Sequence, residues 1–144
     1  MPVIDRRLVV DATVAVKACL SSSGFDYLTA HGLLCGPRLL WSETSSSLCE
    51  LRWRGEIAAE TAREALDRFL TGPIEPIWSD ELFMAATEIA TKLGWARTYD
   101  AEYVALARFL DAPLVTLDAR LMRGAATLAR IIAPTELALR KSEL

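Results

Sequence analysis

The chain has 144 residues, of which 52% are hydrophobic and 24% charged, so we expect one globular domain over residues 1–144. Sixteen Lys and Arg against nineteen Asp and Glu give a net charge of -3. This balance excludes the broad basic face of a protein that holds duplex nucleic acid mainly by charge. The single histidine, His31, excludes a Cys/His zinc site and any mechanism that needs two imidazoles.

The first half of the chain alternates short apolar runs with helical patterns. In chain order, its predicted elements are a strand over 8–10, a helix over 12–18, a short helix over 25–31, a strand over 33–35 and a long helix over 38–54. Gly32 and Gly55 end the second and third of these helices. The long helix is predicted although weak helix formers occupy residues 44–47 in its middle.

The second half continues the alternation. Its predicted elements are a helix over 60–70, a strand over 74–78, helices over 80–93 and 98–110, a strand over 114–117, a short helix that carries Arg120 and Arg123, a strand over 129–132 and a helix over 134–140. Pro76 places its strand at an edge, and Tyr103 lies on the apolar face of its helix. The alternation predicts a three-layer α/β fold with a parallel sheet.

Cysteines and tryptophans are predicted to have structural roles. Cys19, Cys35 and Cys49 include no Cys-x-x-Cys pair, so we expect reduced, small core residues. The four tryptophans, Trp41, Trp53, Trp78 and Trp95, are expected as core or dimer-interface anchors rather than as base-stacking platforms. The chain shows no leader or lipidation signal, and its apolar runs fall far below the ~20 residues of a membrane helix. We therefore expect a cytoplasmic protein with no membrane partner.

Four acidic residues fall where the predicted strands end. Asp11 and Asp118 directly follow two strands, Glu43 lies early in the helix after the second strand, and Asp100 lies in the first turn of the helix that leads to the fourth. Ligands of open parallel sheets bind beyond the carboxyl ends of the strands, so we expect all four at one rim. Taken singly, each Asp can be a helix cap, and Glu50 is an alternative to Glu43 on the same helix face.

Such a group of carboxylates needs a counter-charge. Two unit charges about 4 Å apart repel by roughly 4 kcal/mol at an effective dielectric of 20. Oxygen ligands without imidazole or thiolate favour Mg²⁺ or Mn²⁺, which activate a bound water and neutralise charge at a phosphate. The pattern predicts metal-dependent phosphodiester hydrolysis, and Arg97 and Arg120 near the rim are candidates to hold phosphates.

Four segments also carry a family pattern. They are Val9-Val10-Asp11-Ala12-Thr13, Pro37 to Glu43, Thr98 to Ala107 and Leu114 to Leu121. Together they resemble the PIN-domain ribonucleases, in particular the VapC-like toxins of bacterial toxin–antitoxin modules. The third and fourth segments, Thr-Tyr-Asp-Ala-Glu-Tyr-Val-Ala-Leu-Ala and Leu-Val-Thr-Leu-Asp-Ala-Arg-Leu, are the more specific because their order and separation match as well.

The resemblance implies a Mg²⁺-dependent endoribonuclease that is the toxin of a toxin–antitoxin pair. Its metal ligands would be Asp11, Glu43, Asp100 and Asp118, with Asp11 and Asp100 the firmest, and with Thr13 and Thr116 in support. It further implies a five-stranded parallel sheet in the order 3-2-1-4-5, a homodimer, an RNA substrate and a small antitoxin partner.

Other interpretations stay open at the level of sequence. The segment Asp11-Ala12-Thr13-Val14 also resembles the nucleophile loop of haloacid-dehalogenase-type phosphatases, in which Asp11 would attack phosphorus, but the second acid of that loop is Thr13 here. A receiver-type phosphoacceptor would have only Asp5 and Lys141 for its further acid and lysine. A protein of the PIN fold that binds a partner without catalysis is the alternative from a different class.

Overall fold

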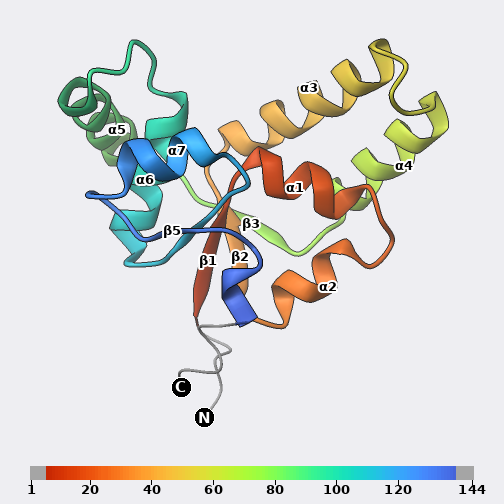
Figure 1. Ribbon diagram of the computed structural model, residues 1–144, viewed down its shortest axis with the longest axis horizontal. Coiled ribbons are helices and arrows are strands. Elements are labelled where there is room, and N and C mark those ends of the chain that lie inside the picture. Colours follow the sequence, from red (N-terminus) through yellow and green to blue (C-terminus); the bar gives the residue numbers. More distant parts are fainter. Residues whose placement is uncertain (1–5, 139–144) are drawn as a thin grey trace.

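The computed structural model describes residues 6–138 (Figure 1). The strands of this part of the chain are β1 (Arg7–Val10), β2 (Leu33–Gly36), β3 (Ile74–Pro76), β4 (Leu114–Val115) and β5 (Ile131–Ile132). The helices are α1 (Ala12–Cys19), α2 (Gly24–Thr29), α3 (Leu39–Trp53), α4 (Ala59–Leu70), α5 (Asp80–Leu93), α6 (Tyr99–Leu110) and α7 (Ala119–Ala125). The alternation predicted from the sequence is therefore confirmed.

The strands form one parallel sheet in the order β3-β2-β1-β4-β5. Central β1 pairs with β2 on one side and β4 on the other, and Val9 lies opposite both Cys35 and Leu114. The sheet order implied by the resemblance is correct, and the proline-containing strand β3 lies at an edge. Because all strands run the same way, their carboxyl ends meet at one edge of the sheet.

Helices cover the sheet from both sides. Figure 1 shows α5, α6 and α7 on one side of β1 and α1 to α4 on the other, with α3 and α4 extending together away from the sheet. Helix α6 lies at the centre, since its residues 101–107 are all buried and it packs against α5, β1 and β4. Three alanines in this stretch allow α6 to lie close to α5 and to the sheet. This packing fixes the first turn of α6 beside the ends of β1 and β4.

Some predicted boundaries and environments are wrong. The strand predicted over 114–117 ends at Val115 in the structure, because the Thr116 side chain turns to Asp11 and to the Asp118 amide. Cys49 is exposed on α3, whereas Cys19 and Cys35 are buried core thiols. Trp53 is 83% exposed, so of the two roles predicted for it, core or dimer-interface anchor, the core role is wrong and the interface role stays a prediction. The predicted helix over 134–140 is helical at residues 136–138, and its last two residues lie outside the described range.

Burial raises the pKa of both the Cys19 and the Cys35 thiols to about 11, which keeps them protonated and unreactive near neutral pH. Within residues 6–138, no helix combines the length and the apolar character that crossing a bilayer would require.

Candidate active site

Asp11 lies directly beyond β1 and caps the start of α1. It is 5% exposed, and its Oδ1 accepts hydrogen bonds from the Thr13 hydroxyl at 2.5 Å and from the Val14 amide at 3.2 Å. Its Oδ2 accepts a hydrogen bond from the Thr116 hydroxyl. Both oxygens of this buried carboxylate are therefore held by neighbouring donors.

The two threonines join the ends of β1 and β4. Their hydroxyl oxygens lie 3.4 Å apart. The Thr13 hydroxyl accepts a hydrogen bond from the Leu117 amide, and the Thr116 hydroxyl accepts one from the Asp118 amide, each at 2.9 Å. This small network fixes the loop after β4 relative to Asp11.

Glu43 reaches the same edge of the sheet from the first turns of α3. The buried Tyr103 of α6 donates a hydrogen bond from its hydroxyl to Glu43 Oε1 at 2.5 Å. Glu50, the alternative on the same face of α3, is instead exposed and forms an ion pair with Arg54. The structure thus brings Glu43 to the ends of the strands and leaves Glu50 on the surface.

Asp118 and Asp100 complete the acidic edge. Asp118 caps α7, and its Oδ1 accepts hydrogen bonds from the amides of Arg120 at 2.9 Å and Leu121 at 3.3 Å. The Nε of Arg120 lies 3.8 Å from the same oxygen, in a loose ion pair. Asp100 lies in the first turn of α6, and no side-chain hydrogen bond to it is formed by the described residues. Asp100 and Asp118 therefore have oxygens free for a ligand.

The four carboxylates repel one another. Burial raises the pKa of Asp11, although its hydrogen bonds to Thr116, Thr13 and Val14 oppose this effect, and the charge of Asp118 adds to it. Burial also raises the pKa of Glu43, as do the charges of Asp100 and Asp11. The pKa of Asp100 is raised by burial and by Asp118, with Arg120 acting in the opposite direction. Each acid is thus within electrostatic range of another.

Three of these acids line a cleft of about 540 Å³. The cleft is lined by Glu43, Asp100 and Asp118, by the α5–α6 segment Gly94, Trp95, Ala96, Arg97 and Tyr99, and by Arg120 and Leu121 of α7. Arg97 and Arg120 are both among the lining residues, so the structure places them at this rim. Asp11, which is more deeply buried, is not in the cleft wall.

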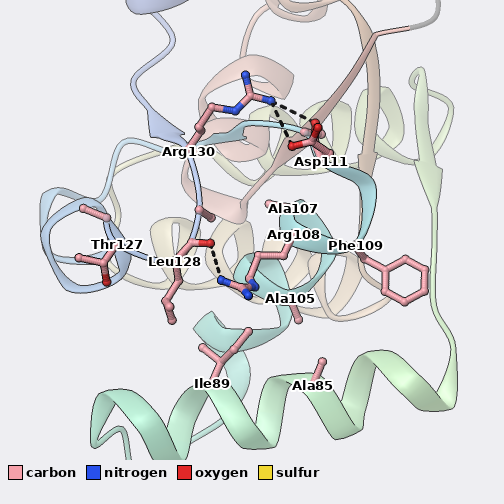
Figure 2. Close-up of a pocket in the computed structure, with 13 residues that line it drawn as sticks. Ala85, Ile89, Ala105, Ala107, Arg108, Phe109, Asp111, Thr127, Leu128 and Arg130 are labelled. Atoms are coloured by element: carbon pink, nitrogen blue, oxygen red, sulfur yellow. Dashed lines mark hydrogen bonds and ion pairs between the residues drawn. The ribbon is translucent and has the colours of Figure 1, made fainter.

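A larger cavity lies at the opposite end of the sheet. It has a volume of about 720 Å³ and lies between α5, α6 and the segment before β5 (Figure 2). Arg108 donates to the Leu128 carbonyl at 2.7 Å, and Arg130 donates to the Asp111 carbonyl at 3.0 Å. None of the predicted site residues lines this cavity, and its arginines are used on the protein's own backbone.

The donor chemistry of the acidic edge fits a hard divalent cation. All four side chains offer carboxylate oxygens, and their mutual repulsion would be relieved by a positive charge. Across residues 6–138, however, no three histidine, cysteine, aspartate or glutamate side chains form a group placed to hold an ion as they stand. An ion held here by one or two of these carboxylates would complete its coordination with water, as Mg²⁺ usually does in proteins.

Sequence reasoning missed two residues next to Glu43. Tyr103 was assigned only to an apolar helix face, yet its hydroxyl orients Glu43. Its position three residues after Asp100, on the same side of the helix, is the signal that could have identified it. Glu102 is 7% exposed, and its pKa is raised by burial and by the charge of Glu43. No sequence pattern distinguishes Glu102 from a solvated helix residue.

The sheet order and the helices on both sides of the sheet define a three-layer α/β protein with an acidic cleft at the carboxyl ends of its strands. The family described as PIN domain matches residues 8–126. The chain therefore belongs to the PIN domain family. This membership decides against the haloacid-dehalogenase-type alternative, in which Asp11 would be a nucleophile.

The chain is similar to curated relatives over most of its length. VapC ribonuclease Mb0985 of Mycobacterium bovis is 37% identical over 114 residues, which cover 79% of this chain and 87% of that protein. Ribonuclease VapC1 of Mycobacterium tuberculosis is 35% identical over 122 residues, which cover 78% of this chain and 86% of that protein.

Solved structures agree on the fold. PAE2754 from Pyrobaculum aerophilum superposes with a TM-score of 0.74 at 20% identity, covering 97% of both chains. The crystal structure of VapBC2 from Rickettsia felis was solved with a bound DNA fragment from the VapBC2 promoter. One of its chains superposes on this chain with a TM-score of 0.64 at 17% identity. That match covers 87% of this chain and 96% of the other.

Proposed function

We propose that the protein is a Mg²⁺-dependent endoribonuclease that hydrolyses RNA phosphodiester bonds and is the toxin of a toxin–antitoxin pair. The observation that carries this proposal is the set of four mutually repelling carboxylates at the carboxyl ends of the strands. Among the described residues, these acids have one ion pair, between Arg120 and Asp118 at 3.8 Å. The ribonuclease names of the VapC relatives support the same activity.

In this proposal, the acids Asp11, Glu43, Asp100 and Asp118 hold Mg²⁺ or Mn²⁺. The bound ion would supply an activated water and neutralise charge on the phosphate under attack. Thr13 and Thr116 keep Asp11 oriented by bonding both of its oxygens. Arg97 and Arg120, in the wall of the cleft, contact the phosphates of the RNA strand.

We further propose three properties of the protein in the cell. It acts in the cytoplasm on RNA, it forms a homodimer, and it is inhibited by a small antitoxin protein. The exposed apolar side chains Phe83 and Met84, which are neighbours on α5, are candidates for such a protein–protein contact. The structures of VapBC2 and of FitAcB from Neisseria gonorrhoeae support such a partner by fold alone.

The proposal is tested by the products of cleavage. Single-stranded RNA incubated with the protein and Mg²⁺ should be cut to leave 5′-phosphate and 3′-hydroxyl ends, because the attacking group is water and not the 2′-hydroxyl. Chelator should stop the reaction, and Mn²⁺ should restore it. Cleavage that resists chelator, or products with 2′,3′-cyclic phosphate, would overturn the mechanism.

One observation favours a second candidate, a protein of the PIN fold that binds a partner without catalysis. It is the spread of the acidic side chains, no three of which form a metal-holding group within the described range. Such a protein would show no heat of Mn²⁺ binding in calorimetry and no RNA cleavage. A measured binding heat that disappears in Asp11→Asn/Asp100→Asn would exclude this candidate.

A further inference from the structure

The cleft is also lined by aromatic side chains that the proposed hydrolysis does not use. Besides the acids, the lining includes Trp95 and Arg97 from the segment that joins α5 to α6, and Tyr99 from the start of α6. Tyr99 is 52% exposed, and Trp95 is half-buried. Two aromatic side chains and two arginines therefore share one cleft with three carboxylates.

Contacts of both its backbone and its indole hold Trp95 in place. Gly94 ends α5 with a φ of +73°, and the Trp95 amide then donates to the Ala90 carbonyl at 2.8 Å. The indole packs on α7 at Gly124, where an added Cβ would lie only 3.2 Å from Trp95 Cζ2. Because α7 begins at Asp118, the indole and the acidic edge are fixed relative to each other.

The chemistry of the cleft selects among possible ligands. A net charge of -3 gives the chain little general attraction for a polyanion, so phosphate contacts alone are a weak source of affinity for RNA. Aromatic faces supply what is missing, since an unpaired base stacks on them whatever its sequence. A base in a duplex has both faces covered by its neighbours and cannot stack in this way.

We infer that Trp95 and Tyr99 form a subsite that stacks one unpaired RNA base next to the phosphodiester bond to be cut, with Arg97 and Arg120 contacting the flanking phosphates. This inference rests on the proposed ribonuclease function and extends it. It makes the protein selective for single-stranded RNA. It also gives Trp95 a role in binding RNA, whereas the sequence predicts a structural anchor at this position. The subsite determines substrate position, and the acids determine the chemistry.

The kinetic test compares aromatic with aliphatic side chains in the full chain. With Mg²⁺ and a single-stranded RNA, Tyr99→Leu and Trp95→Leu should each raise KM about tenfold, the scale of one lost base stack, and leave kcat within about threefold. Tyr99→Phe and Trp95→Phe keep a stacking face and should restore most of the loss.

A matched control separates stacking from a general loss of aromatic surface. Trp53, which is 83% exposed at the end of α3 and does not line the cleft, should tolerate Trp53→Leu with unchanged KM. Melting curves check that each variant is folded, and Gly124→Ala provides a second way to displace the indole without removing it. Equal KM values for the cleft variants and Trp53→Leu would overturn the inference.

Binding measured by fluorescence makes the test independent of turnover. A short single-stranded RNA should quench the tryptophan emission of the wild-type protein, and Trp95→Phe should lose most of that quenching. If the wild-type protein cuts RNA but the cleft variants keep its KM and quenching, only this inference fails. If the wild-type protein cuts no RNA, the proposed function fails. Quenching by a partner protein with none by RNA would assign the cleft to protein recognition and overturn the inference.

Discussion

The two ends of the parallel sheet carry polar residues that are used in different ways. At the amino ends of β4 and β5, Arg108 and Arg130 donate to backbone carbonyls and so close the connections between elements (Figure 2). At the carboxyl ends, Asp100 accepts no side-chain hydrogen bond from described residues, and its charge adds to that of Asp118. The arginines at one end have hydrogen-bond partners within the chain, and the acids at the other end raise one another's pKa.

This difference separates polar residues that stabilise the fold from those available for function. A buried or half-buried charge is retained at a cost unless it is paired. The arginines at the amino end have partners within the chain, whereas Asp100 at the carboxyl end has no side-chain hydrogen bond from a described residue, and the proposed function supplies a cation there. The larger of the two cavities is therefore the less promising site, because its arginines already bond to backbone carbonyls of the chain and no group of mutually repelling acids lines it.

The largest expected effect concerns Asp100. Because Asp100→Asn removes a proposed metal ligand, RNA cleavage should fall by more than about 100-fold, beyond the range of outer-shell changes. Without metal, the same change should raise the free energy of unfolding by roughly 0.5–1 kcal/mol, the scale of one screened charge interaction. Cleavage assays and melting curves measure the two effects. A variant that loses both activity and stability would show that Asp100 is a structural residue.

A second effect concerns pH. Burial raises the pKa of four carboxyl groups, those of Asp11, Glu43, Asp100 and Glu102. Between the ordinary carboxyl pKa of about 4 and the raised pKa values of the folded state, the folded protein therefore binds more protons than the unfolded chain. The free energy of unfolding therefore increases as pH falls through this window and decreases as pH rises. Metal-free protein should melt a few degrees higher near pH 5 than near pH 7.5.

Excess Mg²⁺ should reverse this pH dependence, because protons and the ion compete for the same oxygens. The double variant Asp11→Asn/Asp100→Asn is the control and should show a flatter dependence with no effect of Mg²⁺. Scanning calorimetry in chelator and in Mg²⁺ measures both. A metal-free protein that melts lower near pH 5 would contradict the electrostatic strain inferred for the carboxyl end.

The smallest effect is expected at the amino end. Arg130→Ala removes one hydrogen bond to the Asp111 carbonyl and a long ion pair of 3.9 Å, so the free energy of unfolding should fall by about 0.5–1.5 kcal/mol. RNA cleavage should stay within about twofold of wild type. Arg123→Ala on the exposed part of α7 is the matched control and should change neither quantity. Loss of cleavage in Arg130→Ala would break the distinction between the two ends.

Local pattern was sufficient for most of the fold. The strands, the helices and the edge position of β3 follow from short apolar runs, helical spacing and the placement of Gly and Pro, all of which act within a few residues. Boundaries were harder to predict where a side chain bonds outside its own segment. Thr116 ends β4 early for this reason, because its hydroxyl contacts Asp11, 105 residues away in sequence.

The sequence alone determined that acids follow the strands, and parallel pairing is enough to bring such positions to one edge. Only the tertiary structure decided how each acid is held. Tyr103 bonds Glu43 across 60 residues, and Glu102 is buried beside it, because α6 is enclosed between α5 and the sheet. The tertiary structure also decided that Trp95 faces the cleft, since its position depends on contact with Gly124 of α7. Burial and long-range contact are properties of packing, and neither is encoded within a short stretch of chain.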